Sequence, residues 1–107
     1  MNEIFLTIED NESEIHLDVG DTVKIILDEA STTGYTWEID GESSEQLEIM
    51  LNDFRLTYKK AFGGSGKRIV QLVAKKKGSA NIKLKYWQEW NGEDSVEKRF
   101  SVSFIVE

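Results

Sequence analysis

Three stretches of the sequence carry residue types that contact partners rather than build strands. They are Ser31-Thr32-Thr33-Gly34-Tyr35-Thr36-Trp37, Phe62-Gly63-Gly64-Ser65-Gly66-Lys67 and Tyr86-Trp87-Gln88-Glu89-Trp90-Asn91-Gly92. The glycines of the second stretch free backbone N–H groups, which could cradle an anion. A P-loop, however, needs Gly where Ala61 stands and Ser or Thr where Arg68 stands, and it opens a helix rather than a strand. The second stretch is therefore interpreted as a flexible hairpin loop or as a contact loop.

The histidine and the acidic residues do not show the spacing of a catalytic or metal-binding site. His16 is the only histidine and falls on the polar face of a predicted strand, where nothing places the nucleophile that a catalytic triad requires. The acidic residues lack metal-ligand spacing, so Glu42, Glu45 and Glu48 are interpreted as a solvated loop face. Cysteine is absent, which excludes a disulfide framework and a thiol nucleophile. We expect no catalytic residue, no cofactor and no metal.

The three tryptophans divide into one expected core residue and two loop residues. Trp37 lies on the strand after the first stretch and is the best candidate for a sandwich core. Trp87 and Trp90 flank two polar residues at a strand end and cannot easily share that core. Aromatic side chains on loops are enriched at binding hot spots. A loop packed on its own tryptophans is the alternative.

Period-two alternation of apolar and polar residues predicts the strands that hold these stretches. In the first half, alternating runs cover about residues 4–8, 15–19 and 23–27, a short strand covers 35–39, and weaker strands cover 47–50 and 54–58. The turn Val19-Gly20-Asp21 predicts a hairpin between the second and third runs. In the second half, strands are expected at 67–74, 80–86 and 99–106. About eight short strands predict an all-β antiparallel sandwich or barrel.

The predicted sandwich has one core and one functional end. The core is expected to contain Val23, Ile25, Trp37, Leu72, Ile82, Leu84, Val102 and Phe104. Alternate connections of an antiparallel sandwich fall at the same end. The three unusual stretches follow alternate strands, so Gly34, Gly64 and Trp90 should lie at one edge.

Length and charge limit the remaining possibilities. A chain of 107 residues predicts one domain, 1–107. With 13 basic and 20 acidic residues the net charge is −7, which disfavours nucleic acid and anionic membranes as partners. The first ten residues lack the basic start of a signal peptide. The protein is therefore expected in the cytoplasm if Met1 is the native start, and otherwise exported with a leader removed.

Taken together, the three stretches resemble the loops of the chagasin family, reversible protein inhibitors of papain-type cysteine peptidases. The first family loop reads Asn-Pro-Thr-Thr-Gly-Tyr/Phe with Trp one residue later, and this chain has Ala30-Ser31-Thr32-Thr33-Gly34-Tyr35 and then Trp37. The second reads Gly-x-Gly-Gly, for which this chain has Gly63-Gly64-Ser65-Gly66. The third reads Arg-Pro-Trp, for which this chain has Gln88-Glu89-Trp90.

The resemblance runs from about Ser13 to Val106 and implies an immunoglobulin-like antiparallel β-sandwich of about eight strands. It also implies a monomeric inhibitor that is not an enzyme and that blocks the cleft of a papain-type cysteine peptidase. The implied peptidase-binding residues are Ser31, Thr32, Thr33, Gly34, Tyr35, Gly63, Gly64, Ser65, Gly66, Gln88, Glu89 and Trp90. The alternative is a non-inhibitory module that binds carbohydrate or protein, with Trp87 and Trp90 as an aromatic platform.

Overall fold

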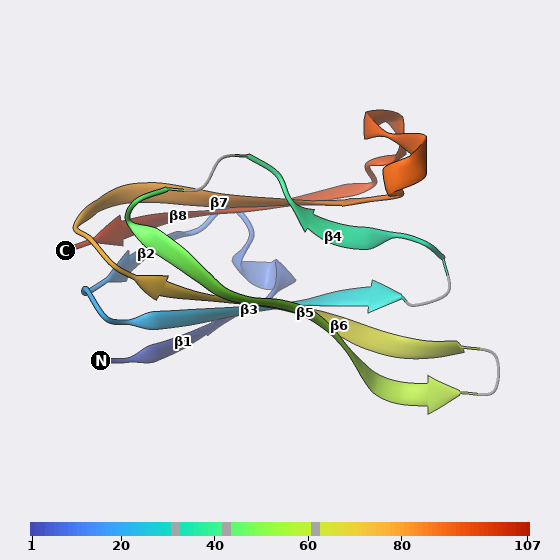
Figure 1. The fold of residues 1–107 in the computed structure, drawn as a ribbon, viewed down its shortest axis with the longest axis horizontal. Coiled ribbons are helices and arrows are strands. Elements are labelled where there is room, and N and C mark those ends of the chain that lie inside the picture. Colours follow the sequence, from blue (N-terminus) through green and yellow to red (C-terminus); the bar gives the residue numbers. More distant parts are fainter. Residues whose placement is uncertain (31–32, 42–43, 61–62) are drawn as a thin grey trace.

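In the computed structural model, the described residues 1–30, 33–41, 44–60 and 63–107 form two four-stranded sheets that face each other (Figure 1). Within 57–60 and 63–65 the description covers the backbone alone. One sheet has the order β1-β3-β6-β5 and the other β2-β8-β7-β4. The strands are β1 (Glu3–Leu6), β2 (Glu14–Leu17), β3 (Thr22–Ala30), β4 (Thr36–Ile39), β5 (Leu47–Lys60), β6 (Gly63–Ala74), β7 (Gly78–Trp87) and β8 (Lys98–Val106).

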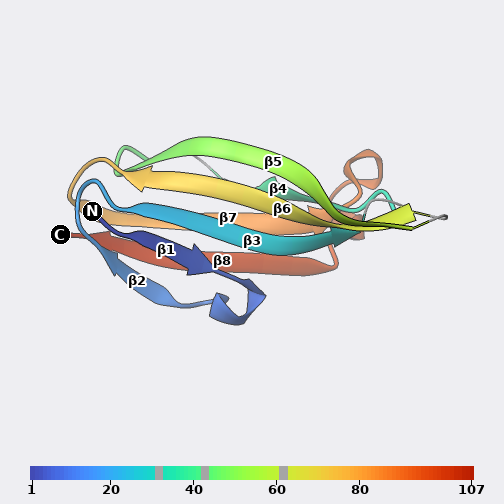
Figure 2. The same cartoon turned by 90° about the horizontal axis from the view of Figure 1, so that it is seen from below.

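The helical segments of the described residues are short 3-10 turns, namely η1 (Ile8–Asp10), η2 (Glu89–Asn91) and η3 (Glu93–Ser95). Across the described ranges, no helix is long and apolar enough to cross a membrane. The structure thus confirms the predicted all-β sandwich. Figure 2 shows the two sheets as layers, with both chain termini at one end and the η2–η3 segment at the other.

The core lies between the sheets and is filled by the inward-facing residues of each alternating strand. All eight predicted core residues are buried, namely Val23, Ile25, Trp37, Leu72, Ile82, Leu84, Val102 and Phe104. Burying one such aliphatic or aromatic side chain stabilises the fold by roughly 1.5–3 kcal/mol. The Trp37 ring is also tilted against the Tyr86 ring, with centroids 5.0 Å apart.

The predicted hairpin between the second and third alternating runs is wrong. Its turn exists, with Gly20 at φ +98 and both Asp21 carboxylate oxygens accepting backbone N–H groups, from Asn2 and Asp18, at 2.9 Å. The turn carries the chain from one sheet to the other instead of joining neighbours. As a result β2 pairs in parallel with β8, while β3 pairs in parallel with β1 and antiparallel with β6. Alternation reports which face is buried but does not identify the pairing partner.

The two weaker strands predicted around Asn52 and Asp53 are one continuous strand, β5, which pairs with β6 along its length. The register shifts between Ile49 and Leu51 and again between Leu56 and Tyr58. Each bulge shifts the alternation of apolar and polar residues by one position. The sequence pattern is therefore interrupted although the strand is continuous. Pairing with β6 overrides the turn preference of Asn and Asp.

Candidate functional site

The described parts of the three sequence-predicted stretches lie at one end of the sandwich, opposite the chain termini (Figure 1). The first loop (31–35) connects β3 to β4, the second motif occupies the far part of the β5–β6 hairpin, and the third loop (88–97) connects β7 to β8. Strand pairing brings them together, since Ala30 is opposite Ser65 and Thr36 is opposite Trp87. Ser31 and Thr32, both predicted to bind the peptidase, lie outside the described residues.

The first loop is anchored by Tyr35 and turned by Gly34. The Tyr35 ring lies 5.4 Å from the Tyr86 ring, centroid to centroid, and packs against the core. Its backbone N–H donates to the Thr33 hydroxyl at 3.3 Å. Gly34 has a φ of +78, in the left-handed region that favours glycine. The predicted contact residues therefore differ in setting, with Tyr35 packed against the core and Thr33-Gly34 at the turn of the loop.

A buried ion pair, which the sequence analysis did not identify, supports the base of this loop. The Glu29 side chain is 3% exposed and accepts from Arg68 Nη2 at 2.7 Å. The same carboxylate accepts the Trp37 backbone N–H at 2.6 Å. Removing one partner of such a pair typically costs 3–5 kcal/mol. The signal was present in the sequence, because Glu29 continues the inward-facing series of Val23, Ile25 and Leu27.

The glycine-rich motif, predicted as a loop, is strand. Gly63 to Gly66 pair with β5, from Lys60 opposite Gly63 to Leu56 opposite Gly66. Backbone groups engaged in a ladder do not form an anion cradle. A Cβ added to Gly66 would collide with the Phe54 ring, so close packing against Phe54 favours glycine here.

The third loop contacts the first. Gln88 Nε2 donates to the Thr33 carbonyl at 3.0 Å, and Gln88 Oε1 accepts from Asn91 Nδ2 at 2.7 Å. The Trp90 ring lies where a Cβ of Gly34 would project, yet Trp90 remains 69% exposed. Loops far apart in the sequence thus form one joined surface, from Thr33 and Gly34 to Trp90.

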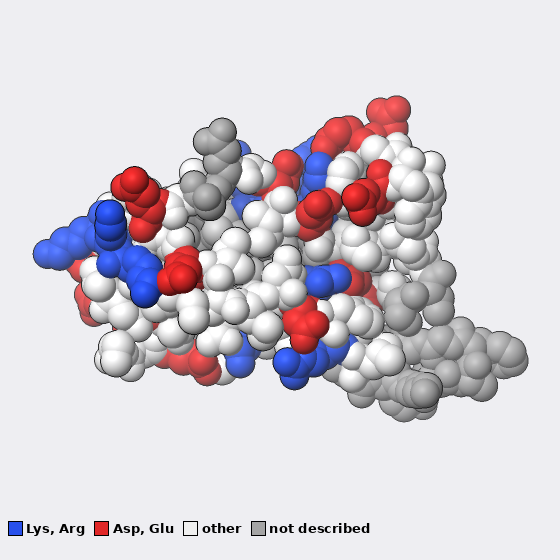
Figure 3. Space-filling model, in the orientation of Figure 1, with Lys and Arg blue, Asp and Glu red and all other residues white. Residues whose placement is uncertain are grey.

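Acidic side chains gather over the third loop and the neighbouring strand, as Figure 3 shows. They include the exposed Glu38, Glu89 and Asp94. Glu93 of the same loop is held by cations, since Lys85 Nζ donates to it at 2.6 Å and Arg99 Nη2 at 3.2 Å. Among the described residues no cluster of three or more potential metal ligands occurs.

The fold and this loop cluster define a binding protein that presents loops from the end of an immunoglobulin-like sandwich. A family model described as "Chagasin family peptidase inhibitor I42" matches residues 16–104. Chagasin from Trypanosoma cruzi is 26% identical over 96 residues, covering 86% of this chain and 87% of that protein. The crystal structure of the cysteine protease inhibitor EhICP2 from Entamoeba histolytica has a TM-score of 0.89 at 23% identity, covering 100% and 97% of the two chains. The solution structure of amebosin has a TM-score of 0.81 at 26% identity, covering 98% of each.

The chain belongs to the chagasin family of peptidase inhibitors. It is a cysteine peptidase inhibitor and not an enzyme, as the sequence analysis predicted. The roles of the individual loop residues in binding a peptidase stay predictions.

Proposed function

We propose that this chain inhibits papain-type cysteine peptidases by covering the active-site cleft with the three loops at the end of its sandwich. The observation that carries the proposal is the joined tip formed by Thr33, Gly34 and Trp90. A solved structure with a TM-score of 0.71 and 17% identity, covering 100% of this chain and 91% of that one, is that of PbICP-C in complex with falcipain-2. That complex supports a peptidase as the partner of this fold.

A concave cleft requires a narrow convex element from its inhibitor. Thr33-Gly34 supplies one, because Gly34 has no side chain to hold the backbone away from a catalytic cysteine. The loop is supported on both sides, by the Glu29–Arg68 pair at its base and by Gln88 from the third loop. A preorganised loop loses less conformational freedom on binding. Blockage is steric, so the inhibitor should be recovered uncleaved.

Flanking contacts come from the other two loops. Trp90 presents a large, exposed aromatic surface beside the tip, the type of residue that carries hot-spot energy. Glu89 adds an exposed carboxylate next to it. The Gly63–Gly66 segment would contact the opposite wall of the cleft with its backbone.

Gln88 stands where the family motif has Arg, and its role here is internal. Its amide bonds to Thr33 and Asn91 and so ties the third loop to the first. The first loop also has Ser31 in place of the family's Pro. The hydrogen bond from Gln88 to Thr33 therefore stiffens the first loop, which lacks the family's proline.

The carbohydrate-platform alternative does not fit the geometry. Trp87 is only partly exposed, and Lys85 Nζ lies 3.6 Å from its ring centroid. Because a cation covers one ring face, Trp87 and Trp90 do not present a shared open platform. The observations favour peptidase binding.

Titration of a papain-type peptidase with the purified protein tests the proposal. We expect complete, reversible inhibition with uncleaved inhibitor. Trp90→Ala should weaken inhibition by about thirtyfold, equivalent to about 2 kcal/mol. Phe5→Ala, which removes an exposed aromatic near the opposite end, is the matched control and should inhibit normally. Absence of inhibition across a panel of papain-type peptidases would refute the proposed function, and equal effects of the two variants would refute the proposed site.

A further inference from the structure

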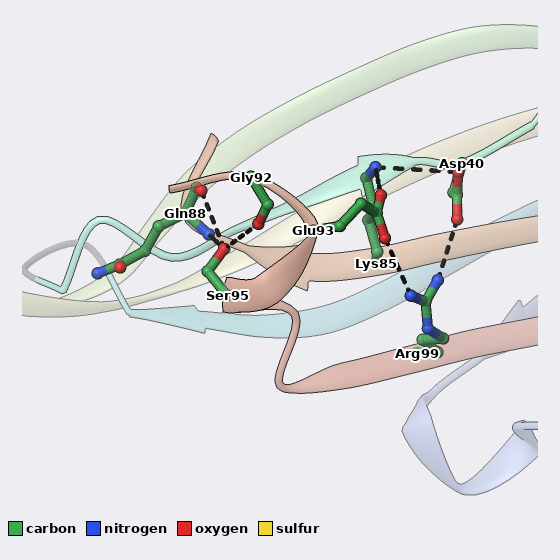
Figure 4. A network of polar contacts seen from close by, with 7 residues as sticks. All are labelled: Asp40, Lys85, Gln88, Gly92, Glu93, Ser95 and Arg99. Atoms are coloured by element: carbon green, nitrogen blue, oxygen red, sulfur yellow. Dashed lines mark hydrogen bonds and ion pairs between the residues drawn. The ribbon is translucent and has the colours of Figure 1, made fainter. Parts of the chain in front are cut away.

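Glu93 connects the third loop to two strands of the second sheet through both of its carboxylate oxygens. Oε1 accepts from Lys85 Nζ on β7 at 2.6 Å, and Oε2 accepts from Arg99 Nη2 on β8 at 3.2 Å (Figure 4). Asp40, just after β4, closes the ring, with Arg99 Nη1 at 3.2 Å and Lys85 Nζ at 3.9 Å. Four alternating charges thus join three strands to one loop.

The cation at the centre of this ring is well shielded from solvent. The Lys85 side chain is 11% exposed, and its ammonium lies over the Trp87 ring. A shielded ammonium needs counter-charges, and Glu93 is its shortest ionic contact. The hydrogen bond that Lys85 donates to Glu93 raises the pKa of Lys85 against the opposing effect of desolvation. The carboxylate of the third loop is therefore the natural partner of a strand residue that cannot easily reach water.

A second tether closes the same loop. Ser95 Oγ accepts the Gln88 backbone N–H at 2.9 Å and lies 2.7 Å from the Gly92 carbonyl oxygen (Figure 4). Residues 88–95 thereby form a closed turn with Trp90 in its first half. The exposed Trp90 ring takes its position from this turn and from its contact with Gly34.

We propose that Glu93 is a positioning residue for peptidase binding, holding the third loop so that the Trp90 ring stays beside the Thr33-Gly34 tip. This inference rests on the proposed function. Glu93 is 61% exposed, and exposed ion pairs contribute little to global stability. Its effect is local, because without the ionic link the η2–η3 segment loses its side-chain tie to Lys85 and Arg99 and holds Trp90 less firmly before binding.

The first test is a double-mutant cycle on peptidase inhibition. Glu93→Gln keeps the size of the side chain and removes its charge. Ordering a loop side chain on binding costs roughly 0.5–1.5 kcal/mol, so Glu93→Gln should weaken inhibition about three- to tenfold. In a Trp90→Ala background the same change should cost less than about twofold, because the residue that Glu93 positions is gone. The neighbouring Asp94→Asn serves as the control for loss of one exposed charge.

An equal factor in both backgrounds would show that Glu93 acts independently of Trp90 and would overturn the proposal, as would no effect of Glu93→Gln on inhibition. Glu93→Asp keeps the charge and should restore part of the loss. Equal weakening by Asp94→Asn would attribute the effect to loop charge in general and would also overturn it.

Hydrogen exchange of the free protein supplies a readout that does not depend on any peptidase. Amides of 88–96 should exchange faster in Glu93→Gln than in the wild type, while those of 100–104 in β8 should be unchanged. Unchanged exchange at 88–96 would overturn the positioning role even if the wild type inhibits. Conversely, a wild type that inhibits no peptidase would refute the proposed function. Faster exchange in Glu93→Gln would then still show that Glu93 orders the third loop.

Discussion

Two of the three loop elements at the functional end are built by opposite means. The β5–β6 hairpin is a backbone ladder that continues from Leu47 opposite Ala74 to Lys60 opposite Gly63. The third loop is a turn of 3-10 helices held by side chains, chiefly Gln88, Glu93 and Ser95. Main-chain pairing tolerates many side chains, whereas side-chain tethers depend on particular residues. Point substitutions should therefore alter binding far more readily in the third loop than in the hairpin.

The departures from the family motifs follow this division. Ser65 replaces a motif glycine in the hairpin, where its backbone pairs with Ala30 and Tyr58, so the ladder loses nothing. Gln88 replaces a motif arginine in the third loop, where its amide makes new bonds to the first loop. The substitution at Ser65 leaves the backbone pairing of the hairpin unchanged, whereas the one at Gln88 changes the contacts that join the third loop to the first.

Among the glycine substitutions, the largest effect on inhibition is expected where the third loop meets the first, at Gly34. Gly34→Ala places a methyl group against the Trp90 ring at a φ of +78. Left-handed backbone costs a non-glycine residue roughly 1–2 kcal/mol, and displacing Trp90 should weaken inhibition by more than about tenfold. Inhibition constants and urea unfolding measure the two effects.

Gly41 provides a matched control for Gly34→Ala. It has a φ of +121, and a Cβ there meets nothing within 4 Å. Gly41→Ala should therefore destabilise the fold through backbone strain alone while inhibition is retained. If Gly41→Ala weakens inhibition as much as Gly34→Ala does, backbone strain and not the Trp90 contact is responsible.

A smaller effect on inhibition, accompanied by a loss of stability, is expected in the hairpin at Gly66. Gly66→Ala forces the Phe54 ring to move, and overpacking of this kind costs roughly 1–3 kcal/mol. Inhibition should change less than about threefold once the protein is folded. In Gly66→Ala with Phe54→Ala, the free energy of unfolding should fall by less than the sum of the single changes. Additive losses would contradict the packing explanation.

Much of the fold could be predicted from sequence because period-two patterns report burial directly. Buried and less buried positions alternate without interruption in β3 and from Phe100 to Val106 in β8, and the core residues predicted in β3, β6, β7 and β8 are buried. Strand partners could not be predicted in the same way. The turn at Gly20 has hairpin chemistry, yet it crosses between sheets, because long-range pairing with β8 and β1 decides where the flanking strands lie.

The site could be predicted only as a set of loops at one end. Motif spacing located Gly34 and Trp90 but did not reveal that the Trp90 ring lies on Gly34. It also could not reveal Glu93, whose role depends on Lys85 and Arg99 being adjacent across β7 and β8. Lys85 alternates with Leu84 and Tyr86 and so stands on the polar face of the predicted strand, where charge is expected. The structure alone shows that its side chain is largely shielded and therefore needs a counter-charge.

The smallest expected effect is a change in the third loop at low pH that the β5–β6 hairpin does not share. Glu93 accepts hydrogen bonds from Lys85 and then Arg99, which lower its pKa below the ordinary value of 4.5. The lowered pKa means that the link is fully present above 4.5 and is lost only as pH falls through the folded-state value. For Lys85 the pKa is raised above 10.5 by Glu93 and, more weakly, by Asp40 and Glu38. The link should therefore persist throughout the range between 4.5 and 10.5.

NMR titration from pH 7 toward pH 3 can follow the loop and the hairpin separately. Amides of 93–96 should shift with a midpoint below 4.5 that tracks the Glu93 carboxyl, whereas the Gly66 amide should not share it, because its ladder contains no part of the ion-pair ring. Lys85→Met removes the main cause of the lowered pKa and should move the Glu93 midpoint upward, toward 4.5. A midpoint above 4.5 in the wild type, or one transition shared by loop and hairpin, would contradict the view that side-chain charge holds the third loop while the backbone holds the hairpin.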